Sequence, residues 1–204
     1  FHPLKVGRVI ARPFLGDNSG SFFRTKNRKD YTFPPPNKTL CDLVVENNRS
    51  CHAIGKIADI FSNRGISTSV SGLSDDALFY KMIDVIKKAK NGDLIFANFV
   101  EFDSLYGHRR DVAGFAAALE RFDLKLVKLL EIINPNDFLI ITADHGNDPT
   151  FKGSDHTREK VPVLMVGNYA QKGNNGNIVF SDVGATMASF LHLSGKLIGT
   201  NIFK

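Results

Sequence analysis

The sequence is poor in cysteine and has no long apolar run. Its two cysteines, Cys41 and Cys51, are spaced as in neither a metal-binding nor a redox motif. No stretch approaches the roughly 18 apolar residues of a membrane span, and the first residues lack the charged and apolar regions of a signal peptide. We therefore expect two reduced thiols in a cytoplasmic protein that has no membrane partner.

Charge is also weakly informative. The formal net charge of +5 favours an anionic partner only loosely, because the basic residues are spread along the chain. Their densest run, residues 24–29, is more often a solvated loop than a binding site, with phosphate binding as the alternative. We expect no nucleic-acid partner.

The chain lacks internal repeats and low-complexity tracts, and its strongest punctuation is a run of three prolines, Pro34 to Pro36. Consecutive prolines continue neither a helix nor a central strand, so this stretch is stiff and extended. We interpret residues 34–37 as a hinge between a leading segment, residues 1–33, and a main domain, residues 38–204.

After the hinge, helical and extended patterns alternate. Apolar spacing predicts helices over residues 40–47, which Thr39 would cap, and over 57–63, 75–89, 112–133 and 183–191. Strands are predicted over residues 50–55, 93–99, 138–142 and 161–166. This alternation predicts an α/β fold, a mostly parallel sheet with helices on both faces.

Ligands of open α/β sheets bind beyond the carboxyl ends of the strands, and polar residues stand there in this sequence. Asp103 and His108 follow the strand over 93–99, Asp144 and His145 follow the strand over 138–142, and His156 comes shortly after. Any one of these segments alone is more often a polar turn or a helix cap. Together, their carboxylate oxygens and imidazole nitrogens suit Mn²⁺, Zn²⁺ or a similar divalent ion. Since no cysteine is near them, a structural zinc site is disfavoured.

These segments resemble the alkaline phosphatase superfamily and, more narrowly, its phosphopentomutase family. The resemblance to the narrower family rests on residues 8–14, 23–31, 54–61, 107–111, 142–150 and 155–159. It implies an alkaline phosphatase-like core and the carboxy-terminal part of a cap domain over residues 1–33. It also implies two divalent cations, commonly Mn²⁺, and a pentose phosphate substrate.

Site residues are implied by the same resemblance. Asp103, His108 and His156 match the ligands of one metal, and Asp144 and His145 match ligands of the other. The candidates for holding the phosphate that is not transferred are Arg12, Arg24, Lys56 and, more weakly, Arg28. Exposed loop charges are the alternative for the arginines.

The activity implied is that of an intramolecular phosphotransferase, an isomerase that interconverts (deoxy)ribose 1-phosphate and 5-phosphate through a phosphothreonine. The family's threonine nucleophile and a further metal-binding aspartate have no counterpart here, so we expect a truncated, proteolysed or separately encoded half. Such a half is expected to be inactive alone, and either to associate with itself or to need a missing amino-terminal segment. The alternatives are another two-metal enzyme, such as a phosphoglycerate mutase or a phosphodiesterase, and a non-catalytic metal- or phosphate-binding module.

Overall fold

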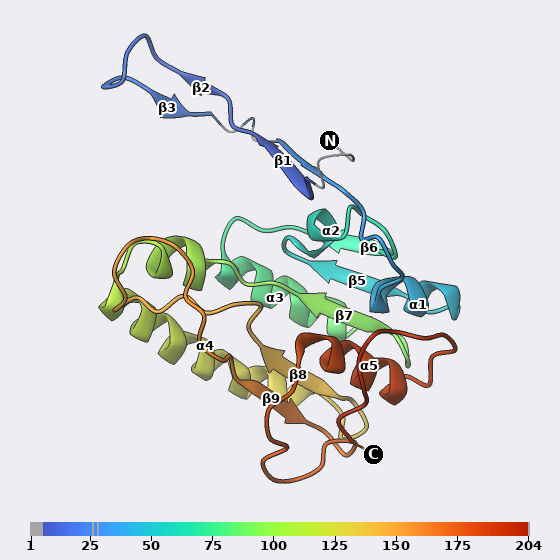
Figure 1. Ribbon diagram of the computed structural model, residues 1–204. Coiled ribbons are helices and arrows are strands. Elements are labelled where there is room, and N and C mark those ends of the chain that lie inside the picture. Colours follow the sequence, from blue (N-terminus) through green and yellow to red (C-terminus); the bar gives the residue numbers. More distant parts are fainter. Residues whose placement is uncertain (1–5, 26, 28, 204) are drawn as a thin grey trace.

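An arm of short strands projects from an α/β core in the computed structural model, which describes residues 6–25, 27 and 29–203 (Figure 1). The core begins with helix α1 (Leu40–Glu46) and ends with helix α5 (Phe180–Phe190). Between them lie the strands β5 (Cys51–Ile54), β6 (Thr68–Val70), β7 (Leu94–Ala97), β8 (Leu139–Thr142) and β9 (Val163–Val166) and the helices α2 (Ile57–Ile60), α3 (Asp75–Ile86) and α4 (Val112–Ile132).

The centre of the core is a parallel sheet in the order β6-β5-β7. Strand β5 pairs with both neighbours: His52 lies opposite Thr68 on one side and opposite Ile95 on the other. All three strands therefore end at the same edge of the sheet. Gly55, at the end of β5, has φ +77°, and an added Cβ there would lie 2.5 Å from the Asn98 carbonyl oxygen. Glycine thus permits both the turn and the close approach of the chain leaving β7.

Helices cover both faces of this sheet, because successive strand side chains point to opposite sides. Cys51 and Leu94 pack with Val44 of α1 and Leu191, next to α5. Ile54 packs on the other face against α3 and α4, where it contacts a cluster made of Leu78, Phe79, Met82 and Leu129. The predicted α/β class, with helices on both faces of a parallel sheet, is confirmed.

The local sequence patterns predicted the positions of helices α1 to α5. The Thr39 hydroxyl accepts from the Asp42 backbone N–H, and the Asp42 carboxylate accepts in return from the Thr39 backbone N–H at 2.6 Å, a capping box that begins α1 as predicted. The differences are at the ends: α2 ends at Ile60 rather than residue 63, α3 ends at Ile86 rather than 89, and α5 begins at Phe180, before the predicted residue 183.

One strand differs in direction from its neighbours. Strand β9 runs antiparallel to β8, with Leu139 opposite Val166 and Thr142 opposite Val163. No helix separates β8 from β9, and a parallel return needs a crossover. Among the described residues, β8 pairs only with β9 and β7 pairs only with β5, so each keeps one edge without a strand partner.

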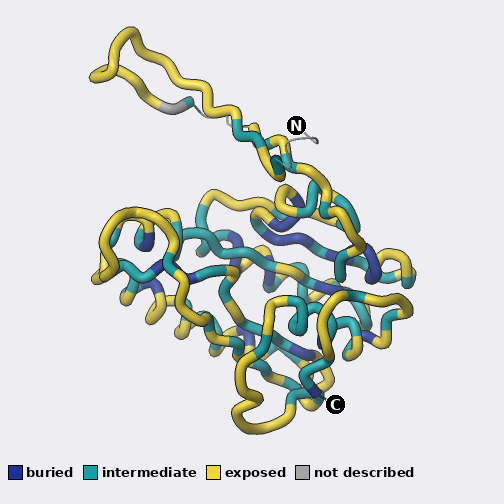
Figure 2. The backbone as a smooth tube through the Cα atoms, viewed as in Figure 1, coloured by how far each residue is buried: buried dark blue, intermediate teal, exposed yellow. Residues whose placement is uncertain are grey.

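The leading segment forms an arm that the helix and strand predictions did not include. Strands β1 (Arg8–Ala11) and β4 (Lys29–Thr32) pair antiparallel, and beyond them β2 (Phe14–Leu15) pairs with β3 (Phe23–Arg24). The arm is almost entirely exposed (Figure 2). It projects on the side at which β5 and β7 end (Figure 1).

The proline run, which the sequence predicts to be a hinge, is held to the core by Arg64. Its guanidinium donates to the Pro35 carbonyl at 2.5 Å, to the Asn37 carbonyl, and to the Asp42 carboxylate at 2.8 Å. The Ser62 hydroxyl donates to the Thr32 carbonyl at 2.9 Å, at the base of the arm. These contacts fix where the arm leaves the core.

Candidate metal centre

Strand β7 leads directly into the first ligand segment, a single π-helical turn, η2 (Phe102–Gly107), that carries Asp103. The link between them is held by Asp75 at the start of α3, whose carboxylate accepts from the backbone N–H groups of Val100 at 2.9 Å and Glu101 at 2.8 Å. Burial raises the pKa of the Asp75 carboxyl above its ordinary value, against the two backbone donors that lower it. The anchoring of η2 thus places Asp103 beyond the carboxyl end of β7.

Strand β8 leads into the second ligand segment, where Asp144 and His145 follow its last residue. The third segment folds back on it. Thr157 pairs with Gly146 through a backbone hydrogen bond of 3.1 Å, and its hydroxyl accepts from the Asp148 backbone N–H at 2.7 Å. This bridge brings the His156 ring against the His145 ring, with centroids 3.6 Å apart and planes 17° apart.

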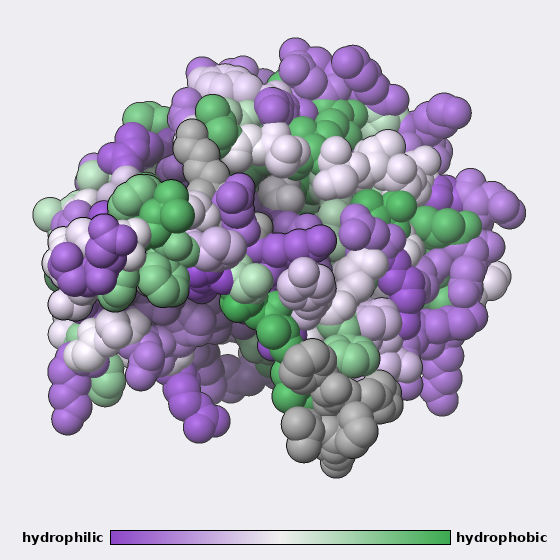
Figure 3. Space-filling model, turned by 90° about the horizontal axis from the view of Figure 1, so that it is seen from above, coloured by the Kyte–Doolittle hydropathy of each residue, from purple (hydrophilic) through white to green (hydrophobic). Residues whose placement is uncertain are grey.

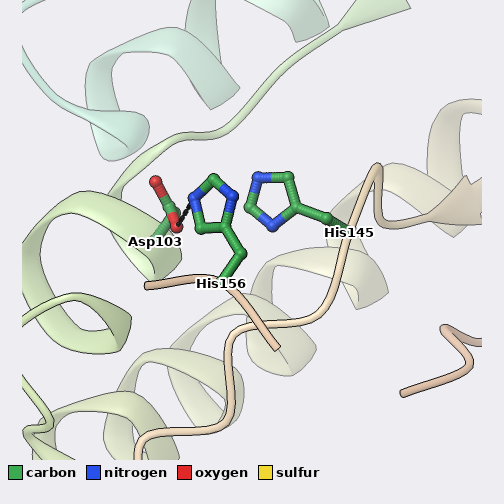
Figure 4. Close-up of side chains that lie close together, drawn as sticks. All are labelled: Asp103, His145 and His156. Carbon is green, nitrogen blue, oxygen red and sulfur yellow. Dashed lines mark ion pairs between the residues drawn. The ribbon is translucent and has the colours of Figure 1, made fainter. Parts of the chain in front are cut away.

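Four of the five predicted ligands meet at one point. Nε2 of His108 lies 3.3 Å from the Asp103 carboxylate, and Nε2 of His156 lies 3.2 Å from the same carboxylate and 3.2 Å from His108 Nε2. Donor atoms of Asp103, His145 and His156 all lie within 4.8 Å of one another (Figure 4). Asp144 is beside the cluster: its carboxylate lies 3.7 Å from His145 Nε2, and its side chain is 72% exposed.

The imidazoles are turned as metal ligands require. Nδ1 of His108 lies 2.5 Å from the Ser154 carbonyl oxygen, and Nδ1 of His145 lies 3.1 Å from the Gly146 carbonyl oxygen. A carbonyl only accepts, so each Nδ1 donates, and Nε2 is the ring nitrogen that faces the carboxylates of the cluster. Metal-bound histidines use this same pattern, in which the second ring nitrogen donates to a backbone carbonyl.

The donor set therefore fits a divalent cation. It combines carboxylate oxygens with imidazole nitrogens, and the side chains of Asp103, His108 and His156 are 33%, 40% and 44% exposed, which leaves the cluster accessible. Asp103, His145 and His156 thus offer both kinds of ligand atom that such an ion takes, within 4.8 Å of one another.

Two of the predicted phosphate-binding residues, Lys56 and Arg12, lie on segments other than those that carry the metal cluster. Lys56 is exposed and caps α2 directly after Gly55, at the edge where β5 and β7 end. Arg12 is exposed on the arm, between β1 and β2, and lines a shallow pocket with Phe14, Phe22 and Phe23. Arg24 is paired with Phe14 in the β2–β3 ladder, and Arg28 lies outside the described residues.

Two residues of the site received no role from sequence reasoning. Asn147 is 8% exposed and donates from Nδ2 to the Asp103 carboxylate at 2.6 Å. Arg110 donates to Asn147 Oδ1 at 2.6 Å. Both stand inside motifs that carry the ligands, so their position in the sequence was the available signal.

Within the described part of the chain, no helix combines the length and the apolar character needed to cross a bilayer.

Comparison with known proteins agrees with the site. The model of the metalloenzyme superfamily matches residues 47–195, which contain all five candidate ligands. The chain is 52% identical to a phosphopentomutase of Legionella pneumophila (strain Corby) over 95% of this chain and 47% of that protein. It is 52% identical to a phosphopentomutase of Sinorhizobium medicae over 91% of this chain and 46% of that protein, and 47% identical to one of Agrobacterium fabrum over 93% and 47%.

A solved structure of the PH0037 protein from Pyrococcus horikoshii shares the fold, with a TM-score of 0.62 and 15% identity over 86% of this chain and 58% of that one. The chain spans about half the length of the curated relatives it matches. The superfamily and the Asp/His cluster together indicate binding of a divalent metal. The chain belongs to the metalloenzyme superfamily, and the relatives that it resembles over nearly its whole length are phosphopentomutases.

Proposed function

We propose that the complete protein is a cytoplasmic phosphopentomutase that interconverts (deoxy)ribose 1-phosphate and 5-phosphate. One observation carries the proposal: Asp103, His108, His145 and His156 converge beyond the ends of β7 and β8 in a chain about half identical to phosphopentomutases. Fold alone would support only the superfamily, because one fold hosts many chemistries.

The five candidate ligands are enough to contribute to the binding of two adjacent cations. Asp103, His108 and His156, whose donor atoms lie 3.2–3.3 Å apart, would hold one ion. His145 and the exposed Asp144 would hold the other, completed by ligands from outside this chain. We propose Mn²⁺ for both. Two bound divalent ions supply neutralisation of phosphoryl oxygens and stabilise the attacking and leaving oxygens of an in-line displacement.

The basic residues would hold the phosphate that is not transferred. Lys56 stands at the sheet edge that also positions Asp103, while Arg12, Arg24 and Arg28 belong to the arm and to the run that follows β3. We assign residues 1–33 to a cap domain that closes over the sugar phosphate, residues 34–37 to its hinge, and residues 38–204 to the metal-binding core. Guanidinium groups bind phosphate oxygens in a bidentate manner, and lysine adds a point charge.

The remaining parts of the site would come from the rest of the protein. The phosphothreonine that exchanges its phosphoryl group with the sugar, and a further aspartate ligand, are assigned to an amino-terminal segment. Strands β7 and β8 each keep one edge without a partner among the described residues, as expected where a segment is to be added. Without that segment the 204-residue chain should be inactive and should sediment as an oligomer; a monomeric, active chain would contradict both expectations.

Turnover by the full-length protein tests the function. With Mn²⁺ present, it should convert ribose 1-phosphate to ribose 5-phosphate and leave 3-phosphoglycerate and phosphodiesters unchanged. Asp103→Asn, which removes the carboxylate shared by two histidines, should abolish turnover. The control is Asp76→Asn, at a carboxylate that is 64% exposed on α3. Turnover of phosphoglycerate but not of pentose phosphate would contradict the proposal and identify the protein as another enzyme of the superfamily.

A further inference from the structure

We propose that Arg110 and Asn147 form a positioning pair that fixes Asp103 and holds the three ligand segments together for metal binding. The pair contacts the ligand Asp103 and the backbone of the ligand segments, and it acts through the ligands. This inference rests on the metal centre proposed above and adds to it the residues that set its geometry.

Arg110 joins segments that are far apart in the sequence. The two N–H groups of its Nη1 are shared among Asn147 Oδ1 and the carbonyl oxygens of Gly107 at 3.0 Å and Asp148 at 2.9 Å. The guanidinium also donates to the carbonyl oxygens of Gly153 at 2.5 Å and Asp155 at 2.6 Å. These acceptors flank His108, His145 and His156. A guanidinium has five N–H donors in a rigid plane, so one side chain can tie all three segments at once.

Asn147 transmits this tie to the shared carboxylate. Its Oδ1 accepts from Arg110 Nη1 at 2.6 Å, and its Nδ2 donates to Asp103 Oδ1 at 2.6 Å. The orientation of the amide is determined by chemistry, because a guanidinium only donates and an ionised carboxylate only accepts. Asp103 is therefore oriented by a buried amide that is itself oriented by Arg110.

The backbone supports the pair at some cost. Arg110 has φ 55°, in the left-handed region, where a residue other than glycine is strained. At Gly107 an added Cβ would lie 2.5 Å from Asn147 Nδ2, so the chain approaches the amide as closely as glycine allows. An arginine in a backbone conformation that suits glycine indicates that its side chain has a role at this position.

Arg110→Gly is the sharpest test, since glycine adopts this backbone conformation freely while the guanidinium is lost. Removing an outer group that orients a metal ligand weakens metal affinity by about 10- to 100-fold. We therefore expect Mn²⁺, titrated calorimetrically into the chain at a temperature where every variant is folded, to bind that much more weakly to Arg110→Gly and to Asn147→Ala. The visible spectrum of bound Co²⁺, which reports coordination geometry, should change in both.

Two further variants separate positioning from folding. Arg109→Ala removes the neighbouring, exposed guanidinium and should leave Mn²⁺ affinity and the Co²⁺ spectrum unchanged. Arg110→Lys keeps the charge but should not restore affinity, because one ammonium group does not reach acceptors in three segments. Should Arg110→Gly fail to fold, Asn147→Ala and Arg110→Lys carry the same test.

The failures are distinguishable. Variants that bind Mn²⁺ within about two-fold of the wild type with an unchanged Co²⁺ spectrum, even if less heat-stable, would overturn the positioning pair and leave the metal centre standing. A wild-type chain that takes up neither metal would overturn the metal centre and the pair together.

Discussion

The arm and the core use the same kinds of side chain in opposite ways. In the core, Ile54 and Val44 are fully buried, and Phe79 is 1% exposed. On the arm, Phe14 is 59% exposed and Phe23 is 60% exposed. Figure 3 shows apolar side chains gathered on the upper face, over the arm at the left of the view. The core therefore has a buried apolar interior, although Leu124 on α4 and Phe180 on α5 are exposed, whereas the phenylalanines of the arm that the structure describes are all exposed.

This difference in exposure has a consequence for stability. A largely solvent-exposed aromatic cluster contributes little to the stability of the chain that carries it, because little apolar area leaves water. The arm is thus suited to contact further protein or a ligand, and the core is suited to hold ligand segments at fixed positions. Variants in the two regions should differ accordingly.

The largest difference is expected between two phenylalanines. Phe79 packs edge-on against Phe122 and Tyr80 in the core, so Phe79→Ala should lower the free energy of unfolding by about 3–5 kcal/mol. Phe14→Ala on the arm should change it by less than about 0.5 kcal/mol. Denaturant titrations of both variants measure this. Comparable losses would mean that the arm is part of the core's folding unit.

Much of the core was predictable because its signals are local. The Thr39 cap and the apolar spacing of Leu40, Leu43 and Val44 specify α1, and the apolar run around β7 specifies a buried strand. Strand β6 was not predicted, because it has only three residues, two of them polar. It forms a strand because it pairs with β5, which the sequence alone does not show. The direction of β9 was missed too, because an apolar run reads the same in parallel and antiparallel pairs.

The strands of the arm were not predicted from the sequence, for a related reason. Its ladder joins Arg8 to Thr32 through two strands of four residues each, in which no residue is fully buried, so the apolar signal is too short and too weak to predict them. At the site, the rule that ligands bind beyond the carboxyl ends of the strands was sufficient to predict that Asp103 and the histidines lie together. The contact of Arg110 with Asn147 was not predictable, since it spans 37 residues between two loops whose relative position only the fold determines.

A smaller effect is expected where the two regions join. Arg64→Ala removes donors to the hinge carbonyls of Pro35 and Asn37 and to the Asp42 carboxylate, and hydrogen bonds to charged groups are worth about 1.5–3 kcal/mol. The free energy of unfolding should fall by about that amount. Lys38→Ala, which breaks an exposed pair with Glu46, is the control and should cost less than about 1 kcal/mol. Equal losses would show that the hinge is not anchored through Arg64.

The smallest effect is a dependence on pH at the same junction. Burial acts to raise the pKa of the Asp42 carboxyl, but hydrogen bonds from Arg64 and Thr39 outweigh it, so the pKa is lowered in the folded state. An acid whose pKa is lowered by folding stabilises the protein above its unfolded value, about pH 3.9, and this contribution is lost as the pH falls through the folded value.

Unfolding of the metal-free chain, followed at a series of acidic pH values, should therefore become steeply easier below about pH 4 for the wild type and less steeply for Asp42→Asn. Asp17→Asn, on the exposed arm, should retain the wild-type slope. If Asp42→Asn keeps the full acid sensitivity, the junction between arm and core is not held by the ionised form of Asp42, and Arg64 must anchor the hinge through its backbone acceptors alone.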